Sequence, residues 1–294
     1  MRKAAAFFVC ACACGGAPEP VVAQEPAPAP LPTVSVIAPE PTPPVAHRAR
    51  GGAPTVVVSF AEIRKHPEGP RVDAAIRGAP AWRAFPGIDP VRDLDWMTEQ
   101  ENDMLVRHDV PDTQVDAAIA SIAQPMSLGA GLKAWRGTVN GADVVFLRAQ
   151  PNVVRITPAE HADIAARDLL AHPPPAPTFH ANEAVRMRVP DPSRRVAGLP
   201  DDISEARVWI DSRPADAGAD IYGEADCPDA AAAQRDAAAI AALVQSKNSF
   251  AVRLVTAGLL NSVEVKPVDR RVMLHVSANQ QQIEALLNLA PNFY

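Results

Sequence analysis

Proline is concentrated in two segments of this chain, and these segments limit what the sequence can fold into. Eleven of the 31 prolines lie between Ala17 and Pro54, including the run Pro41-Thr42-Pro43-Pro44. Proline fixes φ and lacks a backbone donor, so residues 15–54 are predicted to be a disordered, extended linker of the polyproline II type. At about 3.1 Å per residue, this linker could reach on the order of 100 Å.

A second proline run divides the rest of the chain. Pro173-Pro174-Pro175-Ala176-Pro177 cannot continue a preceding helix, so residues 173–181 are predicted to form another extended linker. The two linkers leave a first unit over residues 55–172 and a second unit over residues 182–294. Each is long enough to bury a core of its own.

The first 14 residues have the composition of an export signal. Arg2 and Lys3 precede an apolar stretch from Ala4 to Val9, which runs into Cys10, Cys12 and Cys14. A basic start, a short apolar run and a small-residue cleavage site are typical of a secretory signal peptide. The stretch is too short for a membrane span, which needs about 20 apolar residues. The chain is therefore predicted to be exported.

The end of this signal resembles the lipoprotein signal of bacteria, in which a small residue precedes a lipidated cysteine. In Val9-Cys10-Ala11-Cys12 an aliphatic residue stands three positions before Cys12, whereas only alanine stands there for Cys14. The lipidation site is thus predicted at Cys12, with Cys14 as the alternative. The resemblance implies a membrane anchor of several acyl chains and a periplasm-facing or outer-membrane lipoprotein. Cleavage after Ala13 without lipid, giving a soluble secreted protein, is the other outcome.

Hydrophobic periodicity predicts an α+β fold in which one arrangement of elements occurs twice. We expect two similar β-β-α-β-β-α units with antiparallel sheets and helices on one face. The first unit would contain strands Leu94–Thr98 and Met104–Asp109, helix Pro111–Gln124, strands Ala142–Arg148 and Asn152–Ile156, and a helix from Thr157. The second would contain strands Ala206–Ile210 and Asp220–Gly223, helix Asp229–Lys247, strands Ser262–Val268 and Arg271–Val276, and a helix opened by Ser277-Ala278-Asn279-Gln280.

Several local signals refine this expectation. Thr157 with Glu160, and Ser277 with Gln280, have the spacing of a capping box. The proline before each first helix, Pro111 or Pro228, is expected in the first helical turn.

The first unit also has additions. Asn140-Gly141 suits a type I′ turn that would join an extra strand, Leu132–Val139, to the next one. Ahead of the unit, Thr55–Ser59 reads as a strand, and Phe60–Lys65 and Arg71–Arg77 read as short helices.

The segment after the first linker, with Asp89-Pro90-Val91-Arg92-Asp93 and Trp96, resembles a group of uncharacterised exported proteins from myxobacteria. The similarity in order extends through most of the two units. It implies no activity, because none is known for that group.

No pattern in the sequence predicts a catalytic, cofactor or metal site. His161 lies between acidic residues in a helix start, His172 and His180 flank the second linker and are expected to be exposed, and His275 is expected to be a sheet histidine at the surface or with a satisfied partner. Cys227 is expected to be a buried small hydrophobe. The net charge of −6 argues against nucleic acid as a partner.

Three functions remain open at this level. The first is a non-catalytic envelope module on a stalk that binds an unknown envelope protein or a small ligand. The second is an envelope hydrolase with a dispersed Asp, Glu and His site, which a deep cleft lined by carboxylates of shifted pKa would favour. The third is a structural component of an envelope assembly.

Overall fold

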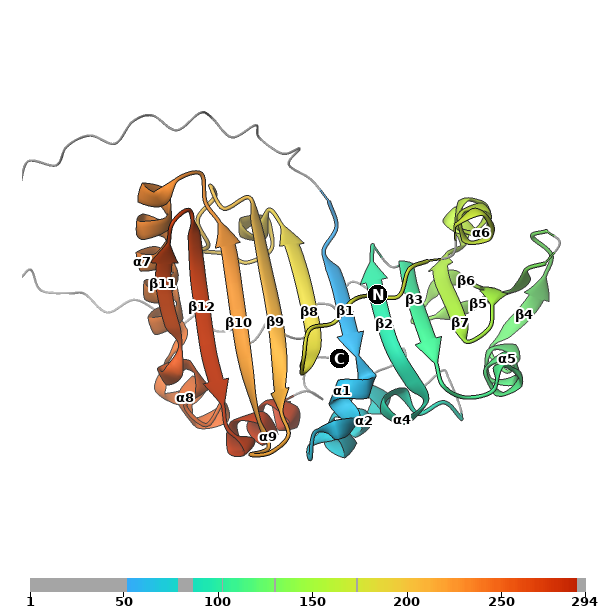
Figure 1. Cartoon of the computed structure of the whole chain (residues 1–294), viewed down its shortest axis with the longest axis horizontal. Helices are drawn as coiled ribbons and strands as arrows, with labels where there is room; N and C mark the ends of the chain where they lie inside the picture. Colours follow the sequence, from blue (N-terminus) through green and yellow to red (C-terminus); the bar gives the residue numbers. More distant parts are fainter. Residues whose placement is uncertain (1–51, 79–86, 102, 130, 173, 290–294) are drawn as a thin grey trace, which may run out of the picture.

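The fold is a single antiparallel sheet with helices packed on it (Figure 1). A computed structural model describes residues 52–78, 87–101, 103–129, 131–172 and 174–289. Within them, twelve strands pair in the order β11-β12-β10-β9-β8-β1-β2-β3-β7-β6-β5-β4. The strands are β1 (Thr55–Ser59), β2 (Leu94–Gln100), β3 (Asp103–His108), β4 (Ala123–Met126), β5 (Lys133–Val139), β6 (Ala142–Gln150), β7 (Val153–Pro158), β8 (Glu183–Pro190), β9 (Glu205–Arg213), β10 (Gly218–Asp226), β11 (Glu264–Val268) and β12 (Arg271–Ala278).

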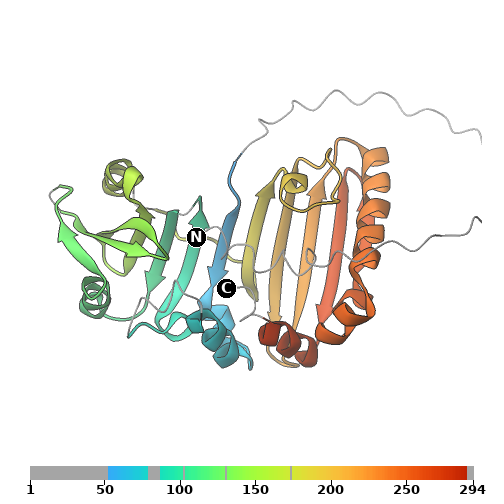
Figure 2. The same ribbon diagram turned by 180° about the vertical axis from the view of Figure 1, so that it is seen from behind.

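The helices pack on the sheet and around one of its ends. They are α1 (Phe60–Lys65), α2 (Gly69–Gly78), α4 (Pro90–Asp93), α5 (Asp112–Ala120), α6 (Ala162–Ala171), α7 (Ala230–Lys247), α8 (Phe250–Val255) and α9 (Gln280–Leu289). Two 3-10 turns, η3 (Ala159–His161) and η5 (Leu259–Ser262), precede α6 and β11. Figures 1 and 2 show α1, α2, α4, α8 and α9 gathered at the lower end of the sheet, and α7 along its outer edge.

The α+β class with an antiparallel sheet is confirmed. The strand order outward from the centre is β1-β2-β3-β7-β6 on one side and β8-β9-β10-β12-β11 on the other. The four strands predicted for each unit thus have the same spatial order in both halves, β2-β3-β7-β6 and β9-β10-β12-β11. The duplication itself stays a prediction. Residues 55–172 and 182–294 contribute to one continuous sheet, because β1 pairs with β8, with Thr55 opposite Arg188.

The helices lie on one face in the second half and on both faces in the first. In β6, Val144 and Phe146 pack with α5, whereas the alternate residues Val145 and Leu147 pack with α6. Alternate residues of a strand point to opposite faces, so the prediction of helices on one face is wrong here. The physical reason is the apolar run in β6, which is buried on both sides.

In the second half the prediction of one helical face holds. Val272, Val276 and Ala278 of β12 share a face, and they pack against α7, η5 and α9. The α7 contacts are made by small side chains such as Ala233 and Ala237. The opposite face of β8–β12 is left without a packed helix among the described residues.

The structure confirms the predicted turn at Asn140-Gly141 and corrects one predicted helix end. Asn140 and Gly141 both have positive φ, 50° and 77°, as a type I′ turn requires. The helix predicted to reach Gln124 ends at Ala120, since residues 123–126 pair with β5 instead. Strand β8 and helix α8 were not predicted.

Both capping boxes were predicted at the wrong residues. Thr157 remains in β7, and its buried hydroxyl has no partner among the described residues. The box of α9 lies two residues later, where the Asn279 side chain accepts from Gln282 N at 3.0 Å and the Gln282 side chain accepts from Asn279 N at 2.9 Å. Each strand continues through the predicted cap because its ladder hydrogen bonds outweigh a single side-chain cap.

The prolines also lie outside the first helical turns. Pro111 is the residue before α5 and makes no side-chain cap, while Pro228 precedes Asp229, which caps α7 by accepting from Ala232 N at 2.7 Å. Of the second linker, predicted over residues 173–181, the described residues 174–180 have no helix or strand and residue 181 begins a turn.

Candidate functional site

The face of β8–β12 without a helix is lined by polar and aromatic side chains, and we call it the polar face. Strand register places Trp209 opposite Tyr222, and Tyr222 opposite His275. The next positions on the same face hold Asp211, Asp220 and Ser277 in one direction and Arg207, Glu224 and Met273 in the other. The polar face therefore has an aromatic row across three strands, with charged rows on both sides.

The aromatic row is closely stacked. The rings of Trp209 and Tyr222 have centroids 5.5 Å apart and an interplanar angle of 19°, and those of Tyr222 and His275 are 4.8 Å and 22°. All three are half-buried.

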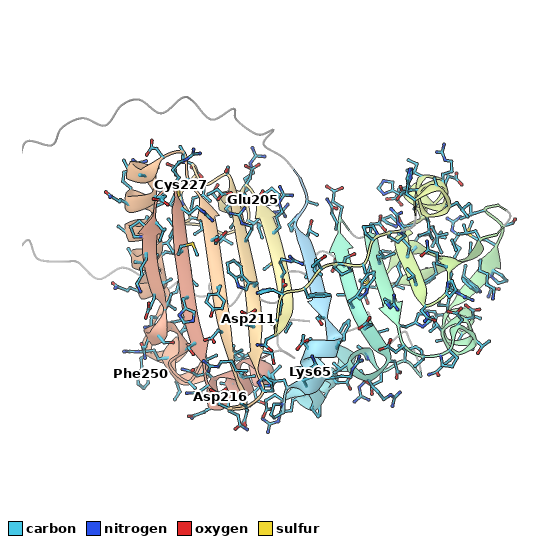
Figure 3. The ribbon with its side chains drawn as sticks, in the orientation of Figure 1. Lys65, Glu205, Asp211, Asp216, Cys227 and Phe250 are labelled. Atoms are coloured by element: carbon cyan, nitrogen blue, oxygen red, sulfur yellow. The ribbon has the colours of Figure 1, made fainter. Side chains whose placement is uncertain are left out.

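Below this row, two carboxylates stand opposite each other on β9 and β10. Asp220 lies 3.1 Å from Arg213 Nη1 and 3.3 Å from His275 Nε2. Burial raises the pKa of Asp211 above its ordinary value, the charges of Glu183 and Asp220 add to the shift, and His180 opposes it. The pair thus combines an ion-paired carboxylate with one whose charged form is disfavoured. Figure 3 shows Asp211 within the open part of the sheet.

His180 connects the second linker to this cluster. Its Nδ1 lies 2.7 Å from Oε2 of the fully buried Glu183, and its Nε2 lies 3.2 Å from Asp211 Oδ1. Arg186 Nε lies 3.0 Å from Glu183 Oε1 and forms an ion pair with that carboxylate. The His180 side chain is 49% exposed, as predicted from the sequence, and it also lies between the carboxylates of Glu183 and Asp211.

The upper part of the polar face is a lattice of alternating charges. Arg207 contacts Glu205, Glu224 and Asp226 at 2.8–3.3 Å. Arg188 and Arg271 extend this lattice to the neighbouring strands through Glu205 and Glu224, at 2.6 and 3.3 Å. The lattice joins four strands, β8, β9, β10 and β12, on one surface.

A groove of about 580 Å³ opens on the same side of the sheet in the first half. Helix α6 forms one wall, and Arg155 joins that wall to the sheet by contacting Asp168 at 2.7 Å and Asp103 at 2.6 Å. The second linker crosses in front of β1 (Figure 1), where Arg186 Nη2 donates to Thr178 O at 2.6 Å. The lining also includes Gln100, His161, His172, Pro174 and Pro175, with Glu99, whose pKa is raised by burial.

The remaining candidate residues have ordinary surroundings. Cys227 is buried, and burial raises the pKa of its thiol to about 12, with the neighbouring Asp236 adding to the shift. His172 is largely exposed, as predicted. Within the described part of the chain, no group of three His, Cys, Asp or Glu side chains is arranged to hold a metal ion.

Some sequence predictions fall outside the described residues. The signal segment 1–14 with its lipidation sites Cys12 and Cys14 lies there, as does almost all of the linker 15–54. Among the helices that are described, none has the length and apolar character needed to cross a membrane.

Comparison with known proteins leaves the family open. No protein-family model matches the sequence, and no curated protein matches it. A solved structure of TP0453, in its crystal form III, is similar to 81% of this chain and 94% of its own chain, with 9% sequence identity and a TM-score of 0.49. Values this low establish neither a shared family nor a shared function.

Proposed function

We propose that this chain is a cell-envelope protein that binds a ligand or partner protein through the polar face without catalysing a reaction. The leader supports export, the predicted modification of Cys12, or alternatively Cys14, supports a membrane anchor, and residues 15–54 supply a spacer between the anchor and the sheet. The myxobacterial resemblance is compatible with an exported protein but names no ligand.

The observation that carries the proposal is the charge network of the polar face. Exposed ion pairs contribute only about 0–1 kcal/mol each to stability, so stability gives little reason to order so many of them on one surface. The side chains of Arg188 and Arg271 are 52% and 50% exposed, and that of His180 is 49% exposed. A binding surface requires such accessible, pre-ordered donors and acceptors.

Site-specific photocrosslinking in intact cells tests the binding surface. A benzophenone amino acid at Arg188 or Arg271 is expected to give a discrete crosslinked product. The control is Arg235, which is 64% exposed on α7, the helix that packs on the other face of the sheet. Products from Arg235 alone, or equal products from all three positions, would contradict binding through the polar face.

Mass spectrometry of the mature N-terminus tests the envelope part of the proposal separately. We expect an acylated Cys12, or Cys14, as the first residue. An unmodified N-terminus after Ala13 would replace the anchor by secretion in soluble form, and recovery of the intact chain with Met1 from the cytoplasm would remove the envelope assignment.

One observation favours the second candidate, an envelope hydrolase. Asp211 and Asp220 face each other across two strands, and the raised pKa of Asp211 beside an ion-paired Asp220 resembles the division between an acid and a base. Release of soluble fragments from purified peptidoglycan, abolished by Asp211→Asn and by Asp220→Asn, would support hydrolysis and displace the binding proposal. We favour binding because these carboxylates lie on an open sheet face and the groove is elsewhere.

A further inference from the structure

We propose that helix α8 docks on an anionic phospholipid surface, an interaction that goes beyond the binding function of the polar face. The large side chains of α8 are turned outward instead of into the core. Phe250 is 76% exposed, Leu254 72% and Val255 46%. Phe250 and Leu254 are four residues apart and so share one side of the helix.

Helix α8, which carries these exposed side chains, has hydrogen-bonded ends. Ser249 caps α8 by accepting from Val252 N at 3.3 Å, and the Thr256 side chain donates to Val252 O at 2.7 Å at the other end. Val252 is the residue of α8 that turns toward the protein, while Thr256 behind it is buried. The helix is therefore closed by hydrogen bonds at both ends, and its outer side is presented to the surroundings.

The charges around α8 match a negatively charged surface. Residues 244–263 contain Lys247 and Arg253 and no acidic residue, although the whole chain has a net charge of −6. Neither cation pairs with a carboxylate in the part of the chain that the structure describes. Apolar side chains beside unpaired basic ones are the composition of segments that lie in the headgroup region of a bilayer.

The shape and size of the patch favour a membrane over a protein partner. Figure 3 shows Phe250 at an outer corner of the molecule, so the patch is a projection. A stable protein interface buries about 1,200–2,000 Å², which a helix of six residues is too small to supply. Insertion into a bilayer surface requires only a few apolar side chains and nearby positive charge.

Vesicle flotation with the full chain tests this proposal. All variants carry Cys10→Ser, Cys12→Ser and Cys14→Ser, so that acylation contributes nothing to binding. We expect the chain to partition at least tenfold more strongly onto vesicles of phosphatidylethanolamine with phosphatidylglycerol (3:1) than onto phosphatidylcholine vesicles. Phe250→Ser with Leu254→Ser is expected to lower that partition at least tenfold, and Lys247→Glu with Arg253→Glu to remove the preference for the anionic lipid.

The matched control is Ile164→Ser with Leu170→Ser, which changes two exposed apolar residues of α6, 63% and 48% exposed. This control is expected to bind vesicles like the parent chain. The four apolar positions Phe250, Leu254, Ile164 and Leu170 are exposed, and circular dichroism melts of all variants should show unchanged folding. The proposal is overturned if the parent chain does not bind the anionic vesicles, if both serine pairs reduce binding equally, or if the α8 pair changes only self-association in sedimentation experiments.

Discussion

At the scale of single residues, the structure separates buried polar groups that have partners from those that lack them. Glu183 is fully buried but contacts both His180 and Arg186. Asp236 of α7 is only 3% exposed, and its Oδ2 has no hydrogen-bond partner among the described residues. Such a carboxylate is costly to ionise. The stability of the folded protein therefore depends on whether Asp236 is protonated.

We predict that Asp236→Asn stabilises the protein at pH 7. Burial raises the pKa of Asp236 above that of the unfolded chain, so the native state binds its proton more tightly. This stability is fully present below the unfolded pKa of about 4 and is lost as pH rises through the folded pKa. Thermal melts should therefore show an advantage of the variant at pH 7 that shrinks as pH falls toward 4. An advantage independent of pH would contradict a charge effect.

Gly137 illustrates a steric requirement at one residue. A Cβ at this position of β5 would lie 2.8 Å from Ile122 O and 2.9 Å from Ala123 Cβ. We predict that Gly137→Ala destabilises the protein by about 1–3 kcal/mol through overpacking, measured by urea unfolding. Gly78, whose Cβ would meet nothing within 4 Å, is the matched control. If both substitutions change the unfolding free energy equally, β4 and β5 do not pack closely enough at Gly137 to exclude a Cβ.

At the scale of elements, the competition between strands and helix caps decides where each element ends. The sequence places possible caps at Thr157 and Ser277, but both residues lie in strands. In α9 the next polar pair, Asn279 and Gln282, takes over the capping box. In α6 the 3-10 turn η3 begins after Pro158 without a side-chain cap. A capping motif thus predicts that a helix begins nearby, while its exact first residue depends on strand pairing.

Two matched substitutions test this assignment. Asn279→Ala is expected to destabilise the protein by about 1 kcal/mol, because it removes the side-chain acceptor for Gln282 N. Thr157→Val is expected to change the unfolding free energy by less than about 0.5 kcal/mol or to stabilise the protein, since its buried hydroxyl has no partner among the described residues. Urea denaturation of both variants provides the comparison. If Thr157→Val lowers the unfolding free energy more than Asn279→Ala does, Thr157 forms the capping box that was predicted from the sequence.

At the scale of the whole molecule, the two halves are joined by more than the linker. The β1–β8 ladder makes the sheet continuous. At the lower end, His66 Nε2 lies 3.0 Å from Gly218 O, and Arg71 contacts Glu284 at 3.1 Å. His66 is buried. These contacts connect helices near the start of the described chain to β10 and α9, about 150 or more residues later.

We therefore predict that the two halves unfold together. Ile119→Ala creates a cavity in the first half, where Ile119 is 1% exposed, and is expected to cost about 2–5 kcal/mol. Hydrogen exchange should show the same loss of protection in β9 and β10 as in β5 and β6. Unchanged protection of β9 and β10 would instead indicate two independent domains, as the division at residues 173–181 suggested.

The sequence by itself determined the features that depend on neighbours along the chain. The hairpin turn at Asn140-Gly141, the helix beginning after Asp229 and the extended proline segment follow from local backbone preferences and from periodicity over a few residues. For the same reason the class of the fold and the order of most elements could be predicted. The candidate site could not, because the polar pattern of β9 or β10 alone does not reveal what the other strands place beside it.

Only the tertiary structure decided which face of the sheet stays open and which side chains meet there. The stack of Trp209 on Tyr222 and His275, and the meeting of His180 with Asp211, depend on the register of strands that are distant in sequence. Pairing of β1 with β8 and the position of α6 on the opposite face from α5 likewise depend on long-range packing. Those contacts are set by the burial of apolar surface over the whole molecule, which no local pattern encodes.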